Sequence, residues 1–207
     1  AAWLMKRYAV TQLPSVGSLE GLRTIASASR EKSPFIGFGD PVPGAGGTPL
    51  PGASEELQRI ARYLGAGRGS LYLRERATEA LAKKVDLSGS RVVAFATHGL
   101  IGGEAKGAAE PALVLTPPKV ASDIDDGLLT ASEITQLKLD ADWVLLSACN
   151  TASGGTLGAE GLSGLARAFI YAGARTLLVS HWLVDSTAAT ELTTGTFEAL
   201  AKDRGIG

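Results

Sequence analysis

The sequence predicts an α/β fold in which helices cover both faces of a mainly parallel sheet. Several short runs are almost continuously apolar, such as residues 91–99 and 142–149, and this composition is typical of strands that are buried on both faces. Segments with apolar residues at helical spacing separate these runs. Strands and helices that alternate in this way indicate a parallel sheet with helical connections.

The first predicted elements are a strand at 7–15 and a helix at 18–29. Pro14 ends the strand, because proline lacks the backbone N–H that pairing in a sheet requires. Ser18 is a suitable N-cap for the helix, and Glu20 lies in its first turn, where a negative charge is favourable.

A strand at 34–41 and a loop at 42–53 follow. The loop contains so much glycine and proline that no regular element is expected there. Ser54 is expected to begin a helix at 54–64, whose apolar residues recur at helical spacing. A further helix is predicted at 77–85.

The rest of the chain continues the alternation. Residues 111–117 are expected to form a short edge strand or a hairpin arm. Thr130, three positions before Glu133, is expected to cap a short helix at 128–137. The remaining predicted elements are strands at 91–99, 142–149 and 175–182 and helices at 158–174 and 186–200.

Composition limits the class of protein. The 207 residues suit a single domain, 1–207, that buries most of its apolar surface. A net charge of −1 gives no electrostatic reason to bind nucleic acid or an anionic membrane. No apolar run reaches the roughly 18 residues of a membrane-spanning helix, and the chain does not open with the apolar core of a signal peptide. A single cysteine forms no internal disulfide, so a reducing compartment, the cytoplasm, is expected.

The only cysteine and both histidines follow predicted strands. His98, Cys149 and His181 each stand at the carboxyl end of an apolar run, the edge of a parallel sheet at which ligands and chemistry are found. If the strands at 91–99 and 142–149 are neighbours, His98 and Cys149 lie over the same edge. A thiol with an ordinary pKa of ~8.5 needs such a base to become a nucleophile.

Other interpretations of these residues stay open at this point. Cys149 at the end of a buried strand is also compatible with an apolar core residue. A metal site built from His98, Cys149 and His181 lacks a pair of closely spaced ligands, so no metal is expected. The glycine-rich segment 37–47 lacks the lysine and the spacing of a phosphate-binding loop, so no cofactor is expected either.

Several segments together resemble the CHAT family, whose members are relatives of the caspases and separases. The segments are AFATHGL, GLLTASEITQLKL, DWVLLSACNTASGG and GAEGLSGLARAFIYAGARTLLVSHWLVDSTAAT, and the resemblance runs from about Arg7 to Leu200. It implies a caspase-like α/β fold and a cysteine peptidase with a Cys–His dyad. Cys149 follows His98 by 51 positions, close to the roughly 50 that separate the pair in caspases. The caspase wording Q-A-C-x-G is replaced here by SACNT.

The resemblance implies a role for each of these residues. Cys149 corresponds to the nucleophile that attacks a peptide carbonyl, and His98 to the base that later protonates the leaving amine. The backbone N–H groups of Gly99 and Cys149 correspond to an oxyanion hole. His181 is expected to be structural or to form a wall of the pocket. The mechanism uses no cofactor and no metal.

Three further residues are candidates for binding the substrate. In related peptidases the segment after the strand at 175–182 walls the pocket for the residue before the scissile bond. Asp185 would favour lysine or arginine there, Trp182 would face the same pocket, and Glu160 is a second acidic candidate. The alternatives are that Asp185 caps the following helix, that Glu160 interacts with a helix dipole and that Trp182 is a packing residue.

The resemblance also implies partners and a larger setting. Domains of this family commonly follow helical repeats that act as sensors. A helical-repeat regulatory protein and a protein or peptide substrate are therefore the expected partners, and the chain is expected to be a fragment of a longer one. Regulated proteolysis in signalling or defence is the expected role. The alternatives are a catalytically inactive caspase-like scaffold and, from another class, a flavodoxin-like ligand binder.

Overall fold

The computed structural model describes residues 33–44, 47–102, 109–122, 124–147, 158–179 and 186–202. The chain divides into a unit of Ala1–Arg30 and a unit of Glu31–Gly207, and the described residues all belong to the second unit. The strand predicted at 7–15 and the helix predicted at 18–29 lie outside the described residues.

The central sheet has five strands, and every neighbouring pair in it is parallel. The strands are β1 (Ser33–Pro41), β2 (Leu71–Arg74), β3 (Ser90–Ala96), β7 (Trp143–Ser147) and β8 (Leu177–Val179), in the spatial order β2-β1-β3-β7-β8. The predicted α/β class with a mainly parallel sheet is therefore confirmed. β2 is not among the predicted strands, because its four residues are too few to show a periodic pattern.

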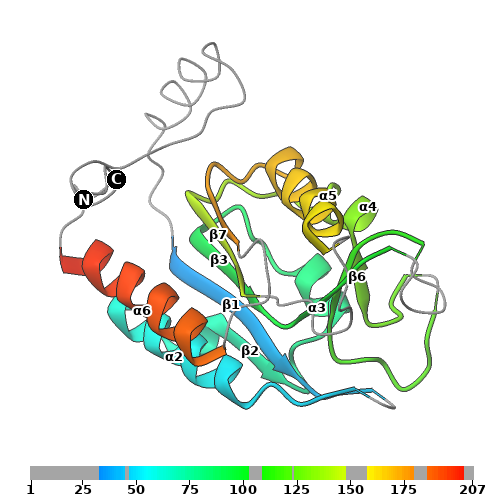
Figure 1. The fold of residues 1–207 in the computed structure, drawn as a ribbon, viewed down its shortest axis with the longest axis horizontal. Helices are drawn as coiled ribbons and strands as arrows, with labels where there is room; N and C mark the ends of the chain where they lie inside the picture. The colour runs from blue at the N-terminus through cyan, green and yellow to red at the C-terminus, as the bar shows by residue number, and fades with distance from the viewer. Residues whose placement is uncertain are drawn as a thin grey trace, which may run out of the picture. The chain divides into compact units, whose positions relative to one another are not determined.

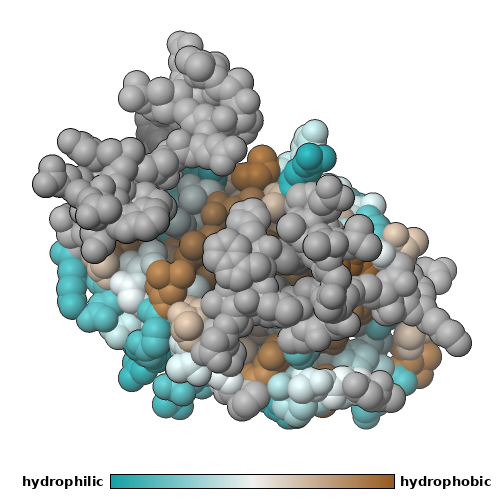
Figure 2. Space-filling view, viewed as in Figure 1, coloured by the Kyte–Doolittle hydropathy of each residue, from teal (hydrophilic) through white to brown (hydrophobic). Residues whose placement is uncertain are grey.

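Helices cover both faces of this sheet (Figure 1). On one face lie α2 (Pro51–Tyr63) and α6 (Ser186–Lys202), which pack side by side; on the other lie α3 (Glu79–Lys84), α4 (Ala131–Ile134) and α5 (Gly158–Tyr171). Figure 2 shows mainly hydrophilic side chains over the outer side of α2 and α6, at the lower left of the view. Both helices therefore bury one side and expose the other.

Alternating side chains of β3 divide the core into two layers. Val92 and Ala94 belong to the layer under α2 and α6, whereas Val93 and Phe95 belong to the layer under the other three helices. The strand is buried on both faces, which explains why its sequence is apolar without alternation. Large aromatic side chains fill both layers, Phe35 and Phe197 in the first and Phe38, Phe95 and Phe169 in the second.

A second sheet, which is antiparallel, begins directly after β3. Its strands are β4 (His98–Leu100), β5 (Ala112–Val114) and β6 (Leu128–Thr130), in the order β4-β5-β6. The strand predicted at 91–99 is therefore two strands. Thr97 stands at the break, where its hydroxyl donates a hydrogen bond to the carbonyl of Val114. Of the two forms expected for the segment 111–117, the edge strand is excluded, because β5 pairs on both sides and is the central strand of this sheet. Its antiparallel pairing agrees with the other form, a hairpin arm.

The start of α2 also differs from the prediction. The helix begins at Pro51 rather than at Ser54, and proline suits the first turn because the N–H that it lacks would have no partner there. The hydroxyl of Ser54 instead accepts a hydrogen bond from Gln58 Nε2 at 3.0 Å. The predicted cap of α4 is confirmed, since Thr130 and Glu133 form a reciprocal capping box.

Gly39 of β1 leaves no room for a side chain. A Cβ at this position would lie 2.6 Å from Leu57 Cδ1 and 2.8 Å from the carbonyl oxygen of Ala96. Because the sheet fixes that carbonyl, Gly39→Ala should lower the free energy of unfolding by about 1–3 kcal/mol. The measurement is unfolding in urea.

The matched control for this change is Gly52→Ala in α2. A Cβ at Gly52 meets nothing within 4 Å, so the free energy of unfolding should rise by about 0.5 kcal/mol. Equal losses of stability at the two positions would contradict the close packing described at Gly39.

Candidate functional site

The carboxyl ends of β3 and β7 lie level with each other. The two strands are parallel neighbours, and Ala96 and Ser147 are Cα partners in their register. His98 and Cys149 each stand two positions beyond this pair in the sequence. The sequence analysis required the strands that precede His98 and Cys149 to be neighbours, and β3 and β7 are neighbours. Cys149 itself lies outside the described residues.

His98 is the first residue of β4, and a backbone carbonyl holds its ring. Its Nε2 lies 2.8 Å from the carbonyl oxygen of Thr48, in the connection between β1 and α2. Because a carbonyl oxygen only accepts hydrogen bonds, Nε2 carries the proton in this contact. In the neutral ring the lone pair is then on Nδ1, which is the nitrogen suited to accept a proton. The sequence contains no signal for this contact, because every residue has a carbonyl and Thr48 is 50 positions from His98.

Gly99 follows His98 in β4 and is buried. It lies opposite Leu113 of β5 in the antiparallel register. The short second sheet therefore fixes the backbone directly after the imidazole. The assignment of the Gly99 N–H to an oxyanion hole stays a prediction.

The other predicted site residues are not among those whose side chains the structure describes. Cys149, His181, Trp182 and Asp185 lie outside the described residues, and Glu160 belongs to α5 by its backbone alone. Helix α6 begins at the residue that follows Asp185 in the sequence. The roles assigned to these five residues stay predictions.

A buried carboxyl group, not predicted from the sequence, lies close to the end of β7. Glu56 of α2 is 2% exposed. Its Oε2 accepts a hydrogen bond from the hydroxyl of Ser147 at 2.9 Å, and its Oε1 accepts one from the hydroxyl of Thr193 at 2.6 Å. Burial raises the pKa of this carboxyl above its usual value, although the hydrogen bonds from Thr193 and Ser147 oppose the shift.

The sequence does contain a signal for Glu56. It stands four positions before Ile60 and directly before Leu57, both fully buried, so it lies on the stripe of α2 that faces the sheet. An acidic residue on the apolar stripe of a helix is unusual, because burial of an unpaired charge is costly. Such a position indicates either a polar partner in the core or a functional group.

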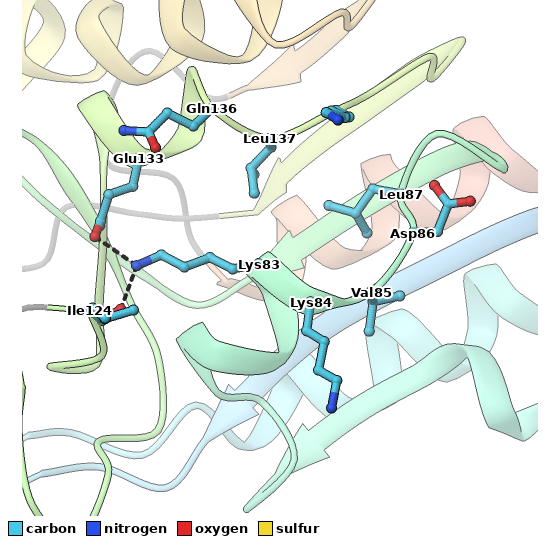
Figure 3. Close-up of a pocket in the computed structure, with 10 residues that line it drawn as sticks. Lys83, Lys84, Val85, Asp86, Leu87, Ile124, Glu133, Gln136 and Leu137 are labelled. Carbon is cyan, nitrogen blue, oxygen red and sulfur yellow. Dashed lines mark hydrogen bonds and ion pairs between the residues drawn. The ribbon is translucent and has the colours of Figure 1, made fainter.

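The pocket in Figure 3, with a volume of about 650 Å³, belongs to another part of the fold. Leu87 and Leu137 line it and precede β3 and β7 in the chain, so the pocket lies toward the amino ends of these strands. The amine of Lys83 there donates to Glu133 at 2.7 Å and to the carbonyl of Ile124 at 2.6 Å. Because ligands of parallel α/β sheets bind beyond the carboxyl ends of the strands, we do not assign the active site to this pocket.

Neither a cluster of metal ligands nor a membrane-spanning helix occurs in the described part of the chain. Its histidine, cysteine, aspartate and glutamate residues form no group of three or more that could hold a metal ion. None of its helices combines the length and the apolar character that crossing a membrane requires.

Comparison with known proteins finds one family and two curated relatives. The family model described as CHAT domain matches residues 1–207. Tetratricopeptide repeat protein 28 of Mus musculus is 29% identical over 170 residues, which cover 68% of this chain and 7% of that protein. The protein of the same name from Homo sapiens is also 29% identical over 170 residues, with the same coverage. The chain thus spans a small part of the length of these relatives.

Replacement of Glu56 tests the environment of its carboxyl group. The pKa of Glu56 is raised in the folded protein from the ordinary value of 4.5, so folding favours the neutral form. The stability contributed in this way is fully present below pH 4.5 and is lost as the pH rises through the folded pKa. Glutamine is neutral at every pH. The Glu56→Gln protein should therefore gain stability relative to the unmodified protein as the pH rises above about 4.5.

The measurement is the free energy of unfolding in urea at a series of pH values from 4 to 8. The matched control is Glu55→Gln, the same chemical change at the exposed neighbouring position. A free energy of unfolding of Glu56→Gln that falls relative to that of the unmodified protein as the pH rises would contradict a raised pKa for Glu56.

Proposed function

The chain belongs to the CHAT domain family, whose model matches it from residue 1 to 207, and we propose that it is a caspase-like cysteine endopeptidase. In this proposal Cys149 attacks a peptide bond of a protein substrate, and His98 is its base. The observation that supports this most directly is the register of β3 and β7, which pairs Ala96 with Ser147. Both functional segments therefore start from the same edge of the sheet, where α/β proteins carry out their chemistry.

The proposed reaction begins with a proton transfer. The thiol of Cys149 gives its proton to Nδ1 of His98, because Nε2 donates to the carbonyl of Thr48. The thiolate then attacks the carbonyl carbon of the scissile peptide. The imidazolium now carries a proton on each nitrogen, and the Thr48 carbonyl keeps the ring oriented and stabilises its charge.

The later steps return the enzyme to its starting state. The N–H groups of Gly99 and Cys149 stabilise the oxyanion, a contribution of roughly 10²–10³ in rate for each donor. The C–N bond breaks as Nδ1 of His98 protonates the leaving amine, and the acyl group stays on Cys149 as a thioester. Water, deprotonated by His98, hydrolyses the thioester and releases the new carboxyl terminus. The reaction needs no cofactor.

The relatives suggest how such an enzyme would be controlled. Both matching curated proteins are named for tetratricopeptide repeats, and the matched region is 7% of their length. We propose that a helical-repeat protein or segment regulates this peptidase in the cytoplasm, in signalling or defence. The pocket for the substrate residue before the scissile bond is proposed to include Asp185, Glu160 and Trp182.

A second candidate function is a catalytically inactive caspase-like scaffold. The observation that favours it is that the matching relatives are named for their repeats and not for an enzymatic activity. Retention of both His98 and Cys149 in the sequence favours the peptidase. A scaffold needs the fold but neither of these side chains.

Substitution of the proposed dyad separates the two functions. Cys149→Ala should abolish cleavage of a peptide library, and His98→Ala should lower turnover by about 10²–10⁴ through loss of the base. The control is Lys84→Ala, at an exposed residue of the remote pocket, which should leave cleavage unchanged. Cleavage that persists in purified Cys149→Ala protein would reject the peptidase assignment.

Substitution of Asp185 tests the specificity of the proposed pocket. A carboxylate at the mouth of a cleft favours a cationic side chain before the scissile bond, so Asp185→Asn should lower cleavage of arginine peptides by roughly 2 kcal/mol or more. Matched leucine peptides should be cleaved as before. If Asp185 instead caps α6, asparagine caps about as well and neither rate changes. Equal losses on both peptides would remove Asp185 from the pocket.

A further inference from the structure

Glu56 connects two elements that are far apart in the sequence. Its carboxyl accepts hydrogen bonds from Ser147 at the end of β7 and from Thr193 in α6. These partners are 91 and 137 positions from Glu56, respectively. One buried group on α2 therefore bridges the end of a central strand and a helix of the covering layer.

The strand partner, Ser147, stands two positions before the proposed nucleophile in the sequence. Trp143 and Leu145 pack in the layer under α2 and α6, and Ser147 follows at the same parity, so its hydroxyl faces α2. Ser147 is the last residue of β7 and stands two positions before Cys149. The contact with Glu56 therefore fixes the point from which the nucleophile segment departs.

The helix partner, Thr193, belongs to the helix that follows two of the proposed pocket residues in the sequence. Thr193 belongs to α6, which begins at Ser186. The proposed pocket residues Trp182 and Asp185 stand between β8 and this helix in the sequence. Glu56 thus contacts both α6, which follows Trp182 and Asp185 in the sequence, and β7, which precedes the proposed nucleophile.

Packing alone gives no reason for a carboxyl group at this position. A methionine or leucine at the same place on α2 would fill the layer without desolvation of an acid. A buried residue that lowers stability is expected where function requires it. Two directed hydrogen bonds also do what apolar contacts do not: they specify the relative placement of β7 and α6.

We propose that Glu56 is a positioning residue, which fixes the end of β7 relative to α6 and thereby aligns the Cys149 segment with the substrate pocket. The inference rests on the proposed function, because that function assigns the nucleophile and the pocket to these two segments. In this proposal Glu56 acts through Ser147 and Thr193, its hydrogen-bond partners among the described residues.

Glutamine and alanine at position 56 should behave differently. The amide oxygen of glutamine can accept from Ser147, and its amide nitrogen can donate to Thr193 Oγ1. The Thr193 hydroxyl can then donate to the carbonyl of Ala189, which already lies 3.0 Å away. Glu56→Gln therefore keeps both links, whereas Glu56→Ala removes both.

The experiment measures alkylation of Cys149, the only cysteine of the chain, by iodoacetamide as a function of pH. In Glu56→Ala, alkylation at pH 7 should slow by about tenfold, and its pH profile should shift toward that of a free thiol with a pKa of ~8.5. Glu56→Gln should stay within about twofold of the unmodified protein. In peptide cleavage, Glu56→Ala should lower kcat more than it raises KM, and Glu56→Gln should restore kcat.

Two further variants separate positioning from general stability. Arg59→Gln removes an exposed ion pair between α2 and α6, in which Arg59 Nη1 lies 3.0 Å from Glu191 Oε1. Because this pair does not involve β7, the substitution should leave the alkylation rate unchanged. Ser147→Ala removes only the link to β7 and should slow alkylation by at least threefold. This small change also serves as the test if Glu56→Ala does not fold.

The outcomes distinguish this inference from the peptidase assignment. Alkylation rates within twofold of each other in the unmodified, Glu56→Ala and Ser147→Ala proteins would overturn the positioning role, even if the protein cleaves peptides. An equal slowing in Arg59→Gln would overturn it as well. If alkylation depends on Glu56 as expected but no peptide is cleaved, the positioning role is supported and the peptidase assignment alone fails.

Discussion

Strand β3 pairs with β1 on one side and with β7 on the other, and helices bury both of its faces. A strand in this position must be apolar on both sides, so polar residues are confined to its ends. Thr97 and His98 follow its last residue directly. At that point the chain leaves the parallel sheet and enters β4, which allows an imidazole to stand at the sheet edge with the Thr48 carbonyl as its partner. β7 is the neighbouring strand that ends level with β3, at the pair Ala96 and Ser147.

Glu79 and Glu56, two buried acids of the described residues, are stabilised in different ways. Glu79 accepts hydrogen bonds from Lys83 and from the backbone N–H groups of Asp126 and Gly127, so a cation and two dipoles balance its charge. Partial burial would lower the pKa of Lys83, but hydrogen bonds to Glu133 and Glu79 raise it above its usual value. This cluster ties α3 to α4 and to the turn before β6. Glu56 differs, because its partners among the described residues are hydroxyl groups and no cation is among them.

Local patterns in the sequence predicted most of the elements but not the contacts between them. The apolar runs around Val93 and Leu145 predicted buried parallel strands, because a strand that is buried on both faces is apolar along its whole length. The break at Thr97 was not predicted, because threonine itself suits a strand and β4 follows β3 after this single residue. The Thr48 contact was not predictable, because it depends on a backbone carbonyl brought close by the fold. The Glu56 contacts depend on the packing of α2 against β7 and α6, although the acidic residue on an apolar stripe was visible in the sequence.

The packing of α2 against α6 has a consequence for how the chain is made. The hydrogen bond between Glu56 and Thr193 spans 137 positions, and ribosomes add roughly 5–20 residues per second. The side of α2 that meets α6 therefore waits on the order of ten seconds for its partner helix during synthesis. Contacts between such distant segments also form slowly in refolding, because a long loop must close before they are made. Until α6 arrives, the apolar surface that it later covers on α2 and the sheet stays exposed to other nascent chains and to chaperones.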